Sequence, residues 1–256
     1  MKRVLIIVGT RPNFIKVTQF KRVAEEMKGV DVRIVHTGQH YDHDMADVFF
    51  TQFGLIPDYY LNIAPGTPNA QMANIMLGLE KLINNECKPD LLIVPGDVNS
   101  TFAAALTANK MGIRLAHLES GLRSNDRAMP EEINRVLTDE ISDYYFVTEQ
   151  SGIDNLIEEQ KNGTIHFVGN TMIDTLVAYE KDIDDSEILH KNNLETKQFV
   201  LMTIHRPSNV DNREGIEKLY QLILELSDRY KIVFPIHPRT SARMKEFDYL
   251  EKFEAI

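Results

Sequence analysis

The chain has 256 residues, of which 43% are hydrophobic and 26% charged, an ordinary globular composition with length for one large or two modest domains. The 38 acidic residues outnumber the 28 basic ones and no lysine- and arginine-rich run stands out, so nucleic acid and anionic membranes are disfavoured as main partners. A single cysteine, Cys87, excludes an internal disulfide and indicates a reducing compartment.

The first predicted element is a buried strand over residues 4–8, which ends in Gly9-Thr10-Arg11-Pro12-Asn13 before a helix over residues 14–27. The apolar run is too short for a signal peptide, and no run approaches membrane-spanning length, so we expect a soluble cytoplasmic protein. A strand–glycine–helix junction can bind phosphate, but without G-x-G-x-x-G it is weak evidence for a dinucleotide. Arg11 and Lys16 lie here and could face an anion, although such residues are more often solvated surface charges.

A second strand over residues 32–36 ends in Thr37-Gly38-Gln39-His40-Tyr41. The following Asp42-His43-Asp44 resembles the D-x-D metal motif of some glycosyltransferases. We favour a structural interpretation, because Asp42 is well placed to cap a helix that continues to residue 50. A further helix over residues 69–82 has its apolar residues at helical spacing and therefore belongs to the core.

Acids and arginines gather after the next two predicted strands. Residues 90–94 form a strand that stops before Gly96-Asp97, and residues 113–118 form one that stops before Glu119. The loop from Glu119 to Pro130 leads into a helix with Glu131 and Glu132 in its first turn, where proline and acids are both favoured. The mixture suits chemistry on an anionic ligand. Equally, the two helical acids could simply stabilise the helix start.

Strands and helices alternate regularly through the first part of the chain. Helices up to residue 111, at residues 149–160 and after Pro130 separate the strands, which continue at residues 144–147 and 165–168. This alternation predicts an α/β fold with a doubly wound parallel sheet. Because such sheets bind ligands at the carboxyl ends of their strands, the candidate residues there support one another. They are Arg11, Gln39, Asp97 and Glu119.

A polar connection over residues 179–197 precedes a second series, with strands at residues 199–203 and 232–235 and a helix at 213–226. The strands end near His205-Arg206 and His237-Pro238-Arg239, and two such pairs favour a shared anionic ligand. Two strands cannot form a stable doubly wound sheet with covered faces. They either extend the first sheet or begin an incomplete second domain, and we favour the second interpretation.

Seven short motifs in chain order carry a family resemblance, and they are Gly9-Thr10-Arg11-Pro12 with Lys16, Thr37-Gly38-Gln39-His40, Gly96-Asp97-Val98-Asn99-Ser100-Thr101, Glu119-Ser120-Gly121-Leu122-Arg123, Met129-Pro130-Glu131-Glu132-Ile133-Asn134-Arg135, Val168-Gly169-Asn170-Thr171 and His205-Arg206. Any one motif is weak evidence, but together they are highly specific and cover nearly the whole chain. The sequence resembles the non-hydrolysing UDP-N-acetylglucosamine 2-epimerase family.

The resemblance implies two Rossmann-like domains facing across a cleft, as in GT-B glycosyltransferases. Residues 1–170 would form the N-terminal domain, and residues 171–256 the start of a truncated C-terminal nucleotide-binding domain. It implies reversible epimerisation of UDP-GlcNAc to UDP-ManNAc at C2, for cell-surface polysaccharide precursors. UDP would be eliminated to leave an enzyme-bound 2-acetamidoglucal and then added back. The resemblance implies a homodimer, and it implies neither a nicotinamide cofactor nor a metal.

The implied chemistry makes demands that the residues can meet. Removing the C2 proton and returning it to the opposite face needs two acid/base groups, and crowded carboxylates have pKa values pushed apart. The growing charge of the leaving UDP needs cationic stabilisation. By resemblance the catalytic residues are Asp97, Glu119, Glu131 and His205, and the substrate contacts are Arg11, Lys16, Asp97, Glu119, His205 and Arg206.

Two departures from the family pattern stand out. The Ser-Gly-Gly turn and the glutamates that hold UDP in relatives are absent, so the chain as it stands could bind nucleotide poorly and be inactive. Asp42 stands where relatives with an allosteric UDP-GlcNAc site carry a second glutamine after Gln39, which puts that control in doubt.

Several alternatives stay open on the sequence. They are a hydrolysing epimerase that releases ManNAc and UDP, an epimerase of another UDP-sugar such as a diacetamido uronic acid, and a non-catalytic nucleotide-sugar-binding module. A retaining glycosyltransferase shares the fold class but does not require the acid-rich loop. A dehydrogenase is disfavoured because the glycine fingerprint is missing.

Overall fold

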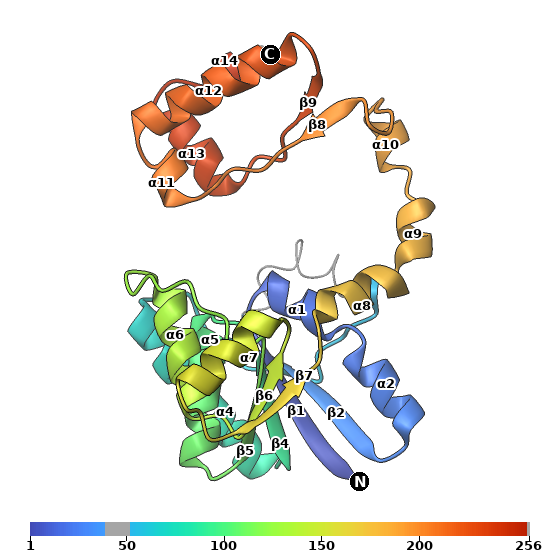
Figure 1. The fold of residues 1–256 in the computed structure, drawn as a ribbon, viewed down its shortest axis with the longest axis vertical. Coiled ribbons are helices and arrows are strands. Elements are labelled where there is room, and N and C mark those ends of the chain that lie inside the picture. The colour runs from blue at the N-terminus through green and yellow to red at the C-terminus, as the bar shows by residue number, and fades with distance from the viewer. Residues whose placement is uncertain (39–51, 255–256) are drawn as a thin grey trace. The chain divides into compact units, whose positions relative to one another are not determined.

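A parallel sheet organises the first part of the chain in the computed structural model, which describes residues 1–38 and 52–254 (Figure 1). Its strands are β1 Lys2–Val8, β2 Val30–His36, β3 Tyr59–Tyr60, β4 Leu91–Pro95, β5 Arg114–Leu118, β6 Tyr144–Val147 and β7 Thr164–Phe167. They lie in the order β3-β2-β1-β4-β5-β6-β7, and each neighbouring pair is parallel. The predicted doubly wound α/β fold is confirmed. The direction of winding reverses between β1 and β4, where ligands of such sheets bind.

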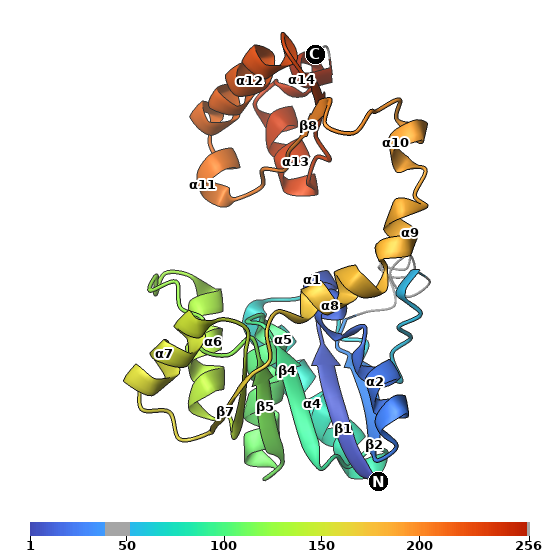
Figure 2. The same cartoon turned by 45° about the vertical axis from the view of Figure 1, so that its right-hand side comes forward.

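Helices cover both faces of this sheet (Figure 2). They are α1 Arg11–Val17, α2 Phe20–Met27, α4 Pro68–Asn85, α5 Asn99–Lys110, α6 Pro130–Glu140, α7 Gln150–Glu158 and α8 Thr171–Ala178. Successive side chains of β1 point to opposite faces of the sheet, as the pleat of a strand requires. Leu5 and Ile7 pack in the cluster that includes α4 and α5, whereas Ile6 and Val8 pack with Phe14 of α1. The alanines of α5 are fully buried, which lets that helix lie close to the sheet.

The single helix predicted over residues 14–27 is wrong, because two helices occupy this stretch. The first begins at Arg11, where Pro12 fits the opening turn, and ends at Val17, and the second begins at Phe20. Between them the Thr18 hydroxyl lies 2.6 Å from that of Thr175, which itself donates to the carbonyl of Ile15 at 2.6 Å. The hydroxyl pair anchors α8 where the helix is interrupted, a tertiary contact that local propensity does not reveal.

The contacts divide the chain into two compact units, residues 1–180 and residues 181–256. The first unit therefore includes α8, which the sequence had grouped with the second domain. The expected polar connection contains two short helices, α9 Glu180–Asp184 and α10 Ile188–Lys191. None of the described helices combines the length and the apolar character that a membrane span requires.

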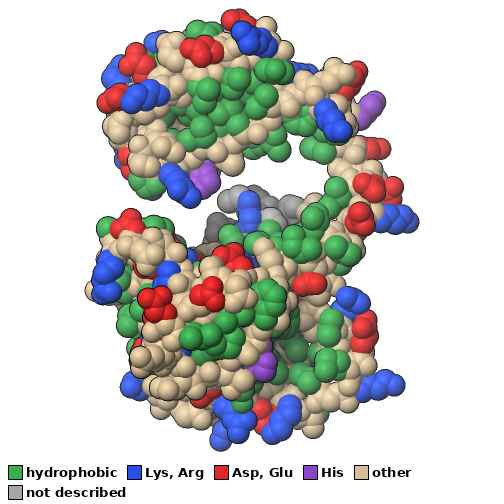
Figure 3. Space-filling view, viewed as in Figure 1, with side chains coloured by type: hydrophobic (Ala, Val, Ile, Leu, Met, Phe, Trp, Pro, Cys, Tyr) green, Lys and Arg blue, Asp and Glu red, His purple; other side chains and the backbone are tan. Residues whose placement is uncertain are grey.

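The second unit contains a sheet of its own. Its further elements are β8 Phe199–Leu201, α11 Pro207–Val210, α12 Arg213–Ser227, β9 Lys231–Val233, α13 Pro238–Glu246 and α14 Leu250–Glu254. Strands β8 and β9 pair with each other in parallel and do not extend the first sheet. Apolar residues of α12 and α13, including Ile216 and Met244, form its core. Hydrophobic side chains also remain on its surface (Figure 3), and several of them line a cavity of about 750 Å³.

Candidate functional site

Three loops leave the carboxyl ends of β1, β4 and β5 and carry most of the residues that the sequence singled out. Gly9 and Thr10 follow β1, Gly96 and Asp97 follow β4, and Glu119 follows β5. The buried side chain of Asn13 joins two of these loops. Its oxygen accepts hydrogen bonds from the amides of Gly9 and Thr10 at 3.3 and 3.1 Å, and its nitrogen donates to the carbonyl of Pro95 at 3.0 Å.

Lys16 and Glu119 form an ion pair at this edge of the sheet. Lys16 Nζ lies 2.5 Å from Glu119 Oε2, and the two side chains are only 11% and 15% exposed. A Cβ atom added to Gly96 would lie 3.1 Å from Lys16 Nζ and 3.7 Å from Glu119 Oε2, so the pair lies against the turn that carries Asp97. Low exposure strengthens such a pair relative to one in open solvent.

The backbone of Glu119 adopts the left-handed conformation, with φ of 71°. For a residue with a side chain, a sparsely populated conformation of this kind costs about 1–3 kcal/mol and is concentrated at functional sites. At Glu119 the amide also donates to the carbonyl of Phe146 at 3.0 Å, which fixes the turn onto β6. The turn thus holds one acidic side chain in a defined place at the edge of the sheet.

Asp97 forms a second ion pair, with Arg135 of α6. The other arm of the same guanidinium contacts Glu132, with Arg135 Nη1 2.7 Å from Glu132 Oε2. Asn134, one residue earlier on the helix, donates to the carbonyl of Asp97 at 3.0 Å. Helix α6 therefore holds both the side chain and the backbone carbonyl of Asp97 in place.

Glu132 supports the loop between Glu119 and α6. Its carboxylate accepts hydrogen bonds from the backbone amides of Ser124 and Asn125, each at 3.0 Å. Burial alone would raise the pKa of Glu132, but these amide donors and the guanidinium of Arg135 hold it below its usual range. The interpretation of the helix-start acids as structural therefore applies to Glu132.

We predict that Glu132→Gln lowers the free energy of unfolding by about 2 kcal/mol at pH 7, because it removes a buried charged acceptor from two backbone amides and the guanidinium of Arg135. The pKa of Glu132 is lower in the folded protein than its unfolded value of about 4.3. Its contribution to stability is therefore complete above that unfolded pKa and is lost as the pH falls through the folded pKa. The gap between variant and wild type in urea unfolding should then shrink below about pH 4. A gap that stays constant from pH 7 to pH 3 contradicts the prediction.

Glu131 has a different environment from its neighbour. Its side chain is exposed, and among the described residues it makes neither a hydrogen bond nor an ion pair. It lines a cavity of about 510 Å³ at the carboxyl ends of β1, β2 and β4, together with Thr10, Asn99 and Asn134. Glu131 is thus accessible to a small molecule, whereas Glu132 is not.

The remaining predicted residues are spread over both units. Arg11 is the first residue of α1 and is exposed. His205 and Arg206 belong to the second unit and are exposed as well, and the ring of His205 stacks on that of His237 with centroids 4.8 Å apart. Arg239, which the sequence paired with His237, instead forms an ion pair with Asp211. Gln39 and Asp42-His43-Asp44 lie outside the described residues.

Sequence reasoning missed the roles of Asn13 and Arg135. Asn13 is the third residue of α1, a position whose side chain commonly bonds back to the residue before the helix, and this signal was available. Arg135 lies three residues after Glu132 on α6, a spacing that brings side chains of opposite charge together. Its contact with Asp97, 38 residues away, has no local signal.

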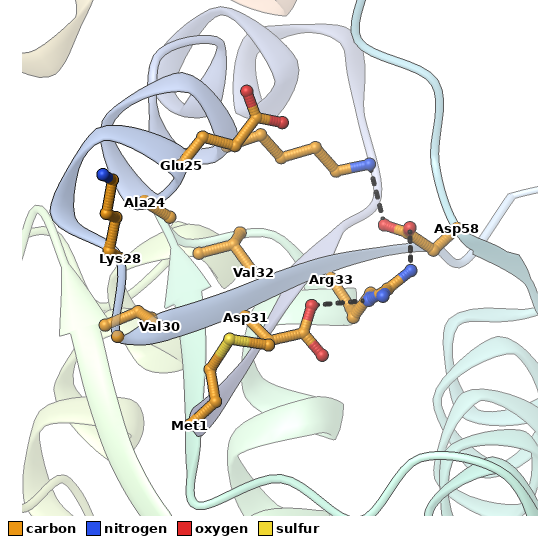
Figure 4. A pocket seen from close by; sticks show the side chains of 11 residues that line it. Met1, Ala24, Glu25, Lys28, Val30, Asp31, Val32, Arg33 and Asp58 are labelled. Atoms are coloured by element: carbon orange, nitrogen blue, oxygen red, sulfur yellow. Dashed lines mark hydrogen bonds and ion pairs between the residues drawn. The ribbon is translucent and has the colours of Figure 1, made fainter.

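A second cavity in the first unit is a poor candidate site (Figure 4). It has about 370 Å³ and lies between α2 and the first half of β2, away from the carboxyl ends of the strands. Two of its cations already face one carboxylate, since Lys21 lies 2.8 Å and Arg33 3.0 Å from Asp58. Its place away from the strand ends that carry Asp97 and Glu119 makes it the weaker candidate.

Comparison with known proteins gives consistent matches. A family model described as UDP-N-acetylglucosamine 2-epimerase matches residues 22–256. The UDP-N-acetylglucosamine 2-epimerase of Methanocaldococcus jannaschii is 40% identical over 257 residues, covering 98% of this chain and 70% of the relative. The UDP-2,3-diacetamido-2,3-dideoxy-D-glucuronate 2-epimerase of Pseudomonas aeruginosa is 37% identical, covering 93% and 67%.

Solved structures agree with the sequence relatives. The crystal structure of the Methanocaldococcus jannaschii UDP-GlcNAc 2-epimerase in complex with UDP-GlcNAc and UDP has a TM-score of 0.86 and 41% identity, covering 100% of this chain and 71% of that one. The enzyme of Neisseria meningitidis bound to UDP-GlcNAc has a TM-score of 0.86 at 29% identity, covering 96% and 69%.

Proposed function

The chain belongs to the UDP-N-acetylglucosamine 2-epimerase family, and from that premise we propose that it interconverts UDP-GlcNAc and UDP-ManNAc without hydrolysing them. The observation that carries this proposal is the pair of cation-held carboxylates, Asp97 with Arg135 and Glu119 with Lys16, on loops at the carboxyl ends of adjacent strands. Inverting a carbon centre through its proton requires acid/base groups of this kind.

The proposed reaction has two halves. In the first, a carboxylate removes the proton from C2 of the sugar, the electron pair of the C–H bond forms a double bond between C1 and C2, and UDP leaves C1 with the electron pair of the C–O bond. In the second, UDP oxygen attacks C1 of the 2-acetamidoglucal while C2 receives a proton on its opposite face. Atoms and electrons balance without a redox cofactor.

Each candidate residue has a defined part in this scheme. Asp97, Glu119 and Glu131 supply the acid/base groups, which must reach both faces of C2. Arg11 and Lys16 of the first unit, and His205 and Arg206 of the second, bind the nucleotide sugar and stabilise the charge that grows on UDP as it leaves. These assignments rest on the strong charge-assisted hydrogen bonds that cationic side chains donate to diphosphate oxygens.

A related substrate is the second candidate. The relative from Pseudomonas aeruginosa acts, by its name, on UDP-2,3-diacetamido-2,3-dideoxy-D-glucuronate and is 37% identical to this chain. The same C2 chemistry would serve that sugar, because its C2 also carries an acetamido group and a proton. The two substrates differ at C3, which is bonded to the carbon that inverts, and at C6, but not at C2 itself.

Product analysis tests the proposal. The full-length protein is incubated with UDP-GlcNAc and, separately, with the diacetamido uronate, and the nucleotide sugars are separated by anion-exchange chromatography. We expect UDP-ManNAc to appear with the sugar still joined to UDP. Release of free ManNAc and UDP would show a hydrolysing epimerase, and conversion of the uronate alone would favour the second candidate.

We further propose that the enzyme acts as a homodimer in the cytoplasm and supplies precursors of cell-surface polysaccharide. The lone cysteine, Cys87, is free, which is consistent with a reducing compartment. Sedimentation velocity of the purified protein tests the dimer. A single species with the mass of a monomer would contradict it.

A further inference from the structure

His117 is a fully buried histidine on β5, two residues before Glu119, and both of its ring nitrogens are engaged. Nε2 lies 2.8 Å from the carbonyl oxygen of Gly96, and Nδ1 lies 2.6 Å from Asp139 Oδ1. A carbonyl oxygen only accepts, so Nε2 carries a proton. The contact of Nδ1 with Asp139 is a second hydrogen bond, so the ring joins a backbone carbonyl to a carboxylate.

Asp139 has the environment of an ionised carboxylate. Burial alone would raise its pKa, but the charges and hydrogen bonds of His117 and Arg123 hold that pKa below its usual range. Arg123 Nη1 lies 2.7 Å from Asp139 Oδ2, and Arg123 in turn forms a two-pronged contact with Glu159 at 2.7 Å. The guanidinium of Arg123 therefore compensates the buried carboxylate of Asp139 and meets the exposed Glu159 on its other side.

The two ends of this arrangement reach both loops that carry the proposed acid/base groups. The Gly96 carbonyl belongs to the peptide group that contains the nitrogen of Asp97, so the ring holds the backbone at the start of Asp97. On the other side, Asp139 Oδ2 accepts a hydrogen bond from the amide of Gly121 at 3.0 Å, two residues after Glu119. The ring of His117, together with Asp139, thus links the Asp97 turn with the Glu119 loop.

Fold stability alone is a poor reason for such an arrangement. Replacing buried ion pairs by well-packed apolar residues is often neutral or stabilising, because the desolvation of the charges offsets their attraction. Gly96 and Gly121, in contrast, lie one and two residues from Asp97 and Glu119. A rigid, directional contact at these positions can fix where the two acid/base groups lie. Misplacement of a reacting group by about 1 Å can cost 10²-fold in rate.

We propose that His117 is a positioning residue of the epimerisation, which sets the place of Asp97 relative to Glu119 through the Gly96 carbonyl and Asp139. It touches neither substrate nor leaving group. The inference rests on the proposed function for its kinetic consequence, while the hydrogen-bonded bridge itself is a property of the folded protein.

Two variants separate the two halves of the bridge. In His117→Gln the amide nitrogen can occupy the place of Nε2 and keep the bond to Gly96. In His117→Asn it can occupy the place of Nδ1 and keep the bond to Asp139. We expect kcat to fall about 100-fold in His117→Asn and less than about 10-fold in His117→Gln, with KM for UDP-GlcNAc nearly unchanged in both. His166→Asn, on the exposed strand β7, is the matched control and should behave as wild type.

A spectroscopic measurement tests the bridge without reference to activity. The imidazole ¹H and ¹⁵N resonances should show that both ring nitrogens of His117 are hydrogen-bonded, Nε2 to the Gly96 carbonyl and Nδ1 to Asp139. A ring with either nitrogen free overturns the inference, as do equal losses of kcat in the two variants or losses that simply follow their melting temperatures. If the wild type does not epimerise, the proposed function fails and the positioning role fails with it. A ring hydrogen-bonded at both nitrogens, with wild-type kinetics in both variants, overturns the positioning role alone.

Discussion

Glu119→Gln is expected to lower kcat by about 10³-fold while the protein stays folded, since a positioned acid/base group contributes about 10²–10⁴-fold. The amide keeps the size of the carboxylate, and its oxygen can still accept the hydrogen bond of Lys16, so the local structure should persist. What the variant loses is a group that can take a proton from C2 or return one. KM should change little, because the change affects the transition state more than the bound substrate.

The comparison for this variant is Glu80→Gln, an exposed glutamate on α4 for which the same chemical change should have no effect. Rates are measured on the full-length protein by separating UDP-GlcNAc from UDP-ManNAc, and folding is checked by circular dichroism. A Glu119→Gln enzyme within about threefold of the wild-type kcat would remove Glu119 from the acid/base role.

Gly121→Ala is expected to destabilise the first unit by at least about 3 kcal/mol, as the sum of a left-handed conformation and a steric overlap. Gly121 has φ of 80°, and a Cβ atom there would lie 2.2 Å from the carbonyl oxygen of Gly152. That oxygen is backbone at the start of α7 and cannot rotate away. The loss is a large share of the roughly 5–15 kcal/mol by which domains are stable.

Gly112→Ala separates the two causes of this loss. Gly112 also has a positive φ, of 65°, but nothing lies within 4 Å of the place where its Cβ would be. It should lose only about 1 kcal/mol, the cost of the conformation. Urea unfolding followed by circular dichroism measures both variants. Equal losses at the two positions would mean that the close approach of Gly121 to Gly152 does not occur in solution.

The sheet could be predicted from the sequence because the patterns that indicate each strand and helix are local. Short apolar runs alternate with helical patterns, and the residues after each run must then lie at one edge of a parallel sheet. Asp97 and Glu119 were placed there by this reasoning alone, and the structure has them on the loops that directly follow the adjacent strands β4 and β5. Reversal of winding between β1 and β4 follows from the sheet order and needed the structure.

The partners of these acids could not be predicted, since each pairing depends on chain segments far apart. Lys16 and Glu119 are 103 residues apart, and Arg135 and Asp97 are 38 apart. The buried role of His117 was equally hidden, because a histidine within an apolar strand gives no sign of which groups its nitrogens will meet. The break between α1 and α2 has the same origin, in a contact with Thr175 of α8.

The structure also separates two adjacent acids that composition cannot distinguish. Glu131 and Glu132 both open α6, yet Glu132 is buried and bonded to the preceding loop, whereas Glu131 lines the cavity. One position thus supports the fold and the other is available for chemistry. Helical geometry explains the difference, because consecutive residues on a helix point about 100° apart.

Solvent exchange at C2 tests the central claim most directly. UDP-GlcNAc is incubated in D2O with the full-length protein, and the C2–H signal is followed by NMR together with the appearance of UDP-ManNAc. Removal and return of the C2 proton predicts that UDP-ManNAc forms with deuterium at C2 and with the sugar still on UDP, and that Glu119→Gln shows neither change. UDP-ManNAc that retains its original C2 proton would contradict the mechanism.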